Sequence, residues 1–289
     1  MRTTILIAAT ILLSGFILRD DIKKLFIAGD GIKKHERQER NENASAEITI
    51  KAQWDLPAIL REVSGIVYLG NDRFACVQDE LGTIFIFNKV SRQIEKEITF
   101  TGPGDFEGIA IKGNTAYVIR ADGMLFEVDM DTKKTKEHKI ASTTVQNIEG
   151  LCYDSKNNRL LLAGKDEDPA LPGYKGIYAF SISKNIFLTE PIFKIALENE
   201  KLTNRKTKKN RSLTPSAIGI HPLTNDLFII DGPKARLLIL DNAGNIKSPY
   251  ELGQRFAKPE GITFTSQGDI YISNEGKKNA ANIIQVEIR

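Results

Sequence analysis

The stretch EGIAIKGNTAYVIRADGMLFEVD, residues 107–129, contains three short apolar segments separated by polar turns. The segments TAYVIRAD (115–122) and GMLFEVD (123–129) are rich in β-branched and aromatic residues, which favour strands. No part of the stretch has the 3.6-residue apolar period of a helix. The stretch therefore predicts three consecutive strands of one small sheet.

The same unit recurs five times along the chain. Successive copies are separated by 43, 42, 67 and 44 residues, measured at the second residue of each start. A period of about 40 to 45 residues with four strands per unit is typical of a β-propeller. The sequence predicts an all-β fold, a five-bladed β-propeller of four-stranded blades, with six blades as the less favoured alternative. The five starts are Ser64-Gly65-Ile66-Val67, Glu107-Gly108-Ile109-Ala110, Glu149-Gly150-Leu151-Cys152, Ser216-Ala217-Ile218-Gly219 and Glu260-Gly261-Ile262-Thr263.

The fifth copy has only three strands, because its third strand, ANIIQVE (281–287), is followed by two residues. The segment AEITIKAQW (46–54) alternates apolar and polar residues ahead of the first copy. We expect this segment to supply the missing outer strand of the last blade. Such a closure removes the open sheet edges that promote aggregation.

The N-terminal segment predicts export from the cytoplasm. Residues 3–18 form one apolar run behind Arg2, and a polar, charged segment follows. The run is shorter than the roughly 20 residues that span a bilayer, which favours a signal peptide, whereas the missing small-residue cleavage motif favours an uncleaved anchor. A buried helix is the third alternative. The expected domains are a signal peptide or membrane anchor at 1–18, a polar tether at 19–45 and the β-propeller at 46–289.

Composition excludes several functional classes. The net charge is +3, and the segment 198–212 alone carries six basic and two acidic residues, so it predicts a basic surface insertion. The remainder is near neutral, which argues against nucleic acid as a partner. The two cysteines and three histidines have no zinc-site spacing. Cys76 and Cys152 fall in blades that do not adjoin, so a disulfide is not expected.

Acidic residues recur at the blade starts. The first strand of each propeller blade lines the central channel, so Glu107, Glu149 and Glu260 should converge on one channel mouth. Three carboxylates together raise one another's pKa unless a cation lies among them. The sequence thus predicts a metal site for Ca²⁺ formed by Glu107, Glu149, Glu260 and Asn274, with Asp105, Asn147 and Asp231 as further oxygen donors. The alternative is that each glutamate caps backbone amides of the neighbouring blade.

Charged residues also end the second strands. We expect a ligand-binding ring there, because equivalent positions in different blades surround the same axis. Two of its members, Arg120 and Lys165, are cations that either neutralise the glutamates or bind an anionic ligand. The predicted ligand-binding residues are Glu80, Arg120, Lys165, Asp231 and Glu275.

The Glu-Gly-Ile starts, the segment SNEG (273–276) and the N-terminal apolar run resemble the SdiA-regulated, or YjiK-like, propeller proteins of bacteria. The resemblance covers residues 46–289. It implies an extracytoplasmic β-propeller in the cell envelope, anchored to the cytoplasmic membrane or released to the periplasm, and it implies no particular reaction. The Glu-Gly starts are also similar to those of calcium-dependent propeller esterases, lactonases and phytase-like proteins.

The starts of copies one and four depart from an acidic ring, because Ser64 and Ser216 replace glutamate. These departures, and the absence of a histidine at a channel position, weigh against an enzyme. The predicted function is binding of a small-molecule or protein ligand at the channel mouth, with Ca²⁺ as a candidate cofactor. The alternatives are a calcium-dependent hydrolase of an ester, lactone or phosphoester and a protein-interaction scaffold.

Overall fold

The computed structural model describes residues 48–140, 145, 147–202, 212–277 and 279–288. The predicted anchor and tether lie outside the described residues, as does most of the basic insertion. In the described part of the chain, no helix is long and apolar enough to cross a membrane. The described residues include two short 3-10 helices, η1 (Ala58–Leu60) and η2 (Gly232–Lys234).

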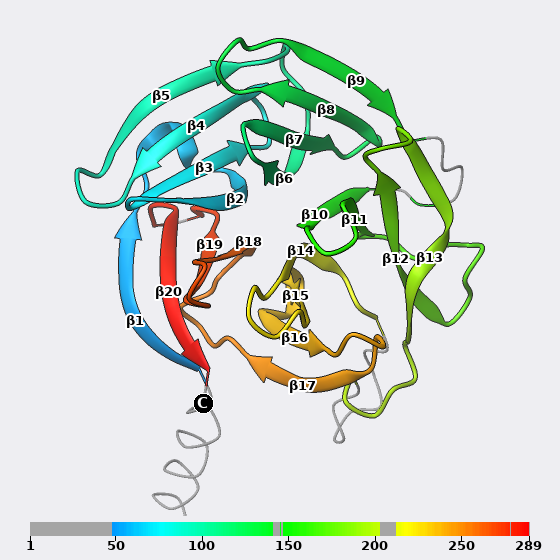
Figure 1. Ribbon diagram of the computed structural model, residues 1–289. Helices are drawn as coiled ribbons and strands as arrows, with labels where there is room; N and C mark the ends of the chain where they lie inside the picture. Colours follow the sequence, from blue (N-terminus) through cyan, green and yellow to red (C-terminus); the bar gives the residue numbers. More distant parts are fainter. Residues whose placement is uncertain (1–47, 141–144, 146, 203–211, 278, 289) are drawn as a thin grey trace, which may run out of the picture. The chain divides into compact units, whose positions relative to one another are not determined.

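Five four-stranded antiparallel sheets surround a common centre (Figure 1). This arrangement confirms the five-bladed β-propeller. Blades 1 and 2 contain β2 (Val63–Gly70), β3 (Arg73–Gln78), β4 (Thr83–Asn88), β5 (Gln93–Thr99), β6 (Phe106–Lys112), β7 (Thr115–Arg120), β8 (Met124–Asp129) and β9 (Thr135–Lys139). Blades 3 and 4 contain β10 (Ile148–Asp154), β11 (Arg159–Gly164), β12 (Tyr174–Ser181), β13 (Ile186–Ala196), β14 (Pro215–Ile220), β15 (Leu227–Asp231), β16 (Arg236–Leu240) and β17 (Ile246–Glu251). Blade 5 contains β18 (Pro259–Phe264), β19 (Ile270–Asn274), β20 (Asn282–Ile288) and β1 (Ile48–Asp55).

The hydrophobic core is divided among the blade interfaces. Because successive side chains of a strand point to opposite faces of the sheet, each blade packs apolar residues against both neighbours. Five clusters result, and each joins two adjacent blades. The two cysteines are buried in different clusters and are not bonded to each other, as expected.

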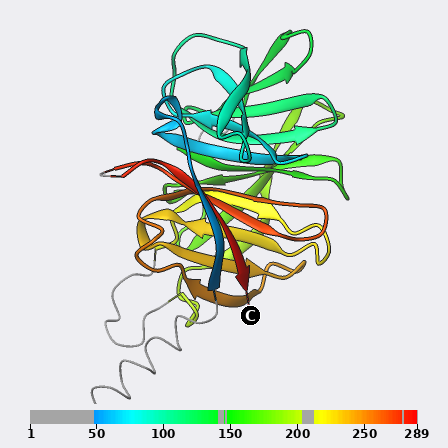
Figure 2. The same cartoon turned by 90° about the vertical axis from the view of Figure 1, so that its left-hand side faces the viewer.

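The ring closes between the two ends of the propeller domain. Strand β1 pairs antiparallel with β20, with Ile48 opposite Ile288 and Trp54 opposite Ile283. Figure 1 and Figure 2 both show these strands side by side, in blue and red. The predicted closing strand is therefore confirmed.

A cation–aromatic contact strengthens this closure. The ammonium of Lys89, from blade 1, lies 4.8 Å from the ring centroid of Trp54 and 5.1 Å from that of Tyr271. The same ammonium donates a hydrogen bond to the Tyr271 hydroxyl at 3.1 Å. Because Trp54 and Tyr271 belong to blade 5, the contact ties the first blade to the last.

Candidate functional site

Every innermost strand begins with a β-bulge. In each blade the register shifts across the second residue of the strand, so that residue has no partner in the ladder. A bulge bends the strand and re-aims a side chain. The bulged residues are Ser64, Glu107, Glu149, Ser216 and Glu260.

The two serines connect blades. Ser64 Oγ donates to the Phe106 carbonyl oxygen at 2.6 Å, and Ser216 Oγ donates to the Pro259 carbonyl oxygen at 2.7 Å. Phe106 and Pro259 begin the innermost strands of the following blades. The alternative role expected for the glutamates was to form hydrogen bonds with the backbone of the neighbouring blade. In the structure, the two serines form hydrogen bonds of this kind between blades.

The three glutamates line one recess at the end of the channel where the innermost strands begin. We call this end the carboxylate mouth and define it by Glu107, Glu149 and Glu260. The cavity volume of the recess is only about 10 Å³. The recess therefore has no room for more than about one water molecule below the carboxylates.

Two lysines pair with the glutamates. Lys165 Nζ lies 2.5 Å from Glu149 Oε1, and Lys258 Nζ lies 3.4 Å from Glu260 Oε1. Lys258 also pairs with Glu275. Within the described residues, Glu107 has neither an ion-pair partner nor a hydrogen-bond partner for its carboxylate. The mouth therefore has three carboxyl groups for two paired ammonium groups.

Burial and mutual repulsion raise the carboxyl pKa values at the mouth. The pKa of Glu107 rises to about 8, because burial disfavours its charged form and because Glu149, Asp105 and Glu260 lie nearby. Burial also raises the pKa of Glu149 to about 7, although Lys165 opposes the change. Burial is also the main cause that raises the pKa of Glu260. At neutral pH the mouth is therefore partly protonated.

Comparison with known proteins identifies the family. Residues 40–279 match the SdiA-regulated family. The chain belongs to this family. No curated protein matches the sequence.

Solved structures support the fold of this SdiA-regulated protein. Glutaminyl cyclase from Myxococcus xanthus aligns with a TM-score of 0.57 and 15% identity over 83% of this chain and 96% of that one. A protein of unknown function from Bacteroides thetaiotaomicron aligns with a TM-score of 0.52 and 13% identity, over 78% of this chain and 58% of that one. At such low identity these similarities show the shared propeller fold and nothing about activity.

The predicted ligand-binding ring of the SdiA-regulated propeller is only partly assembled. Lys165 and Glu275 join the network of the carboxylate mouth. Arg120 instead forms a two-point ion pair with Asp122, at 3.0 and 2.8 Å. Asp231 is fully buried and pairs with Arg236 at 2.8 Å, and Glu80 is exposed at the surface. Neither Arg120 nor Asp231 therefore pairs with the glutamates, and no ion pair joins Glu80 to the mouth among the described residues.

Lys258 and Lys175 were missed by sequence reasoning. Lys175 is buried, and its ammonium donates to the carbonyl oxygens of Gly164, Lys165 and Asp166 at 3.3, 3.0 and 2.6 Å. Burial lowers its pKa to about 8. Since these carbonyls belong to the segment that carries Lys165, Lys175 positions the lysine that pairs with Glu149.

The carboxylate mouth of the SdiA-regulated propeller does not fit Ca²⁺ as it is arranged. Across the part of the chain that the structure describes, no group of three or more His, Cys, Asp or Glu side chains is placed to hold a metal ion. Two carboxylates face ammonium groups, whereas Ca²⁺ takes about six to eight oxygen ligands. Asn274 donates to Asn282 Oδ1 at 3.0 Å and lines a different cavity. The further donors Asp105 and Asn147 are exposed, and Asn147 donates to Asp166.

Proposed function

We propose that this SdiA-regulated propeller is a binding protein whose carboxylate mouth holds a small organic ammonium ligand outside the cytoplasm. The observation that supports the proposal is the convergence of three glutamates from three blades. Among the residues that the structure describes, nothing pairs with the Glu107 carboxylate. An unpaired, partly buried carboxylate is costly, and a bound cation removes that cost.

The chain's own lysines indicate which kind of cation suits the mouth. Glu149 and Glu260 each form an ion pair with a side-chain ammonium group. The Lys165 and Lys258 side chains are 42% and 36% exposed, so solvent reaches both. A ligand ammonium approaching from solvent has Glu107 available as its first partner. It gains charge-assisted hydrogen bonds, which are the stronger class.

Protons compete with such a ligand. Because Glu107 and Glu149 have pKa values of about 8 and about 7, a rise in pH converts neutral carboxyls to carboxylates. Binding of an ammonium ligand should therefore strengthen as pH rises through this window and weaken as pH falls. A site that binds an anion would show the opposite dependence.

Titration calorimetry with spermidine tests this function. We expect at least about tenfold tighter binding at about pH 8 than at about pH 6. Glu107→Gln should weaken binding at the higher pH by at least about tenfold, because glutamine resembles the protonated carboxyl in shape and lacks its charge. The matched control is Glu97→Gln, which removes an exposed carboxylate on β5 and should leave binding unchanged.

The same experiment separates the alternatives. Equal spermidine affinity in Glu107→Gln and the unmodified protein would contradict the ammonium site. Calcium chloride is titrated in parallel. If calcium bound and spermidine did not, the metal site would regain support and the calcium-dependent hydrolase would become the leading function.

The location is proposed from the apolar run at residues 3–18 and the polar segment that follows. We expect a reporter that is active only outside the cytoplasm to give a signal when it is fused after Ser45. A reporter that is active only in the cytoplasm should stay silent at the same position. The reverse result would contradict export.

A further inference from the structure

One aliphatic side chain from each blade surrounds the channel below the carboxylate mouth. These side chains line both the recess at the mouth and a second pocket on the other side. Each belongs to a different one of the five inter-blade clusters, so side chains from two adjacent blades pack around it and hold it in place. We call them the aliphatic ring, and they are Ile66, Ile109, Leu151, Ile218 and Ile262.

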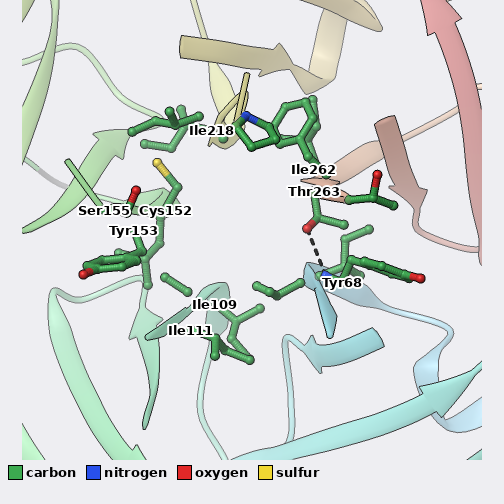
Figure 3. Close-up of a pocket in the computed structure, with 18 of the residues that line it drawn as sticks. Tyr68, Ile109, Ile111, Cys152, Tyr153, Ser155, Ile218, Ile262 and Thr263 are labelled. Atoms are coloured by element: carbon green, nitrogen blue, oxygen red, sulfur yellow. Dashed lines mark hydrogen bonds between the residues drawn. The ribbon is translucent and has the colours of Figure 1, made fainter. Parts of the chain in front are cut away.

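The second pocket lies at the opposite end of the channel, where the innermost strands end. Its cavity volume is about 370 Å³. The wall consists of residues from the second halves of these strands and from the turns that follow them. Figure 3 shows side chains from all five innermost strands around the opening, including Tyr68, Ile111 and Tyr153.

No charged side chain is found among the described residues that line this pocket. The property is notable because 27% of the chain is charged. The aliphatic ring forms the floor, and Tyr68, Tyr153 and Phe264 contribute aromatic surface. The hydroxyls near the rim are partly engaged, since Thr263 Oγ1 already accepts a hydrogen bond from the Tyr68 amide at 2.9 Å. We call this site the uncharged pocket.

We propose that the uncharged pocket is a second binding site, for a small neutral molecule with an apolar body. Its volume falls in the range of about 300 to 1,000 Å³ that is typical of small-molecule sites. Burial of an apolar body against the aliphatic ring and the aromatic side chains, together with hydrogen bonds to uncharged polar groups of the lining, supplies the binding free energy. A charged ligand loses its hydration on entering and finds no opposite charge. The site is separate from the carboxylate mouth, because the aliphatic ring lies between them.

Fluorescence titration with N-phenyl-1-naphthylamine tests the proposal on the full chain. This probe is neutral, and 8-anilino-1-naphthalenesulfonate has the same aromatic framework with an added negative charge. We expect saturable binding of the neutral probe with a dissociation constant on the order of micromolar and at least about tenfold weaker binding of the sulfonate. Absence of saturation with the neutral probe, or equal affinity for the two probes, would overturn the proposal.

Variants locate the bound probe. Ile111→Trp fills the pocket from β6 and should weaken binding of the neutral probe at least about tenfold. Ser155→Trp adds the same side chain at an exposed position on the rim, and it carries the test if Ile111→Trp does not fold. The matched control is Leu223→Trp, since Leu223 is 65% exposed and lies outside the lining.

Leu223→Trp and Glu107→Gln should both bind the neutral probe with the affinity of the unmodified protein. Unchanged binding in the folded pocket-filling variants would place the probe elsewhere and overturn the proposal. Loss of probe binding in Glu107→Gln would place the probe at the carboxylate mouth and overturn it as well. A failure of spermidine binding has no bearing on this outcome, so the two sites are tested separately.

Discussion

A chain that starts at Leu56 should unfold at a temperature about 15 °C lower than a chain that starts at Ser45. The difference corresponds to about 5 kcal/mol for a domain of this size. The shorter chain lacks β1, whose residues from Ile48 to Asp55 pair with β20 except at a bulge at Lys51. Without β1, the unpaired amide and carbonyl groups of β20 become a sheet edge.

The apolar contacts of β1 contribute most of this effect. Ile48 and Ile50 pack against the cluster between blades 4 and 5, and Trp54 packs against the cluster between blades 5 and 1. Each large apolar side chain contributes about 1.5 to 3 kcal/mol when it is fully buried, and these three are partly buried. The lost contact between Trp54 and Lys89 adds to the loss.

Thermal unfolding followed by circular dichroism measures the difference. The chain starting at Ser45 is the control, because it retains β1 and lacks only the segment before it. If both chains melt at the same temperature, β1 does not close the ring. Aggregation of the shorter chain alone is the expected companion result, since it exposes an unpaired strand.

Gly108→Ala should destabilise the propeller by about 3 kcal/mol, at the upper end of what overpacking in a core costs. A Cβ atom at this position would lie 2.7 Å from the Glu149 carbonyl oxygen and 2.8 Å from Leu151 Cβ. Both atoms belong to β10 of the next blade. Because strands β6 and β10 are both packed at the channel, neither moves away without disturbing the aliphatic ring.

Gly102→Ala is the matched control, since no atom lies within 4 Å of the position that its Cβ would take. Chemical denaturation of the two variants measures the difference in unfolding free energy. We expect Gly102→Ala to lie within about 0.5 kcal/mol of the unmodified protein. Equal stability of the two variants would show that the innermost strands have room to separate at the channel.

The sequence by itself determined the blades and their closure. The strand pattern is local, because alternating apolar residues and turn residues specify strand and turn wherever they occur. Repetition at a near-constant spacing then fixed the number of blades, and the short fifth copy indicated a strand from the N-terminal side. The convergence of Glu107, Glu149 and Glu260 followed from the same symmetry, since equivalent positions in a propeller face one axis.

The tertiary structure alone decided how those glutamates are used. Lys165 follows β11 and Lys258 precedes β18, so the two lysines occupy different positions in the repeat. Both nevertheless pair with a glutamate at the mouth. The bulges cannot be predicted from residue types either, because they depend on the register between neighbouring strands. Ile66, Ile109 and their counterparts look like ordinary strand residues in the sequence. Only when five blades are packed do these side chains meet and divide the channel into a carboxylate mouth and an uncharged pocket, because their separation depends on non-local packing between blades.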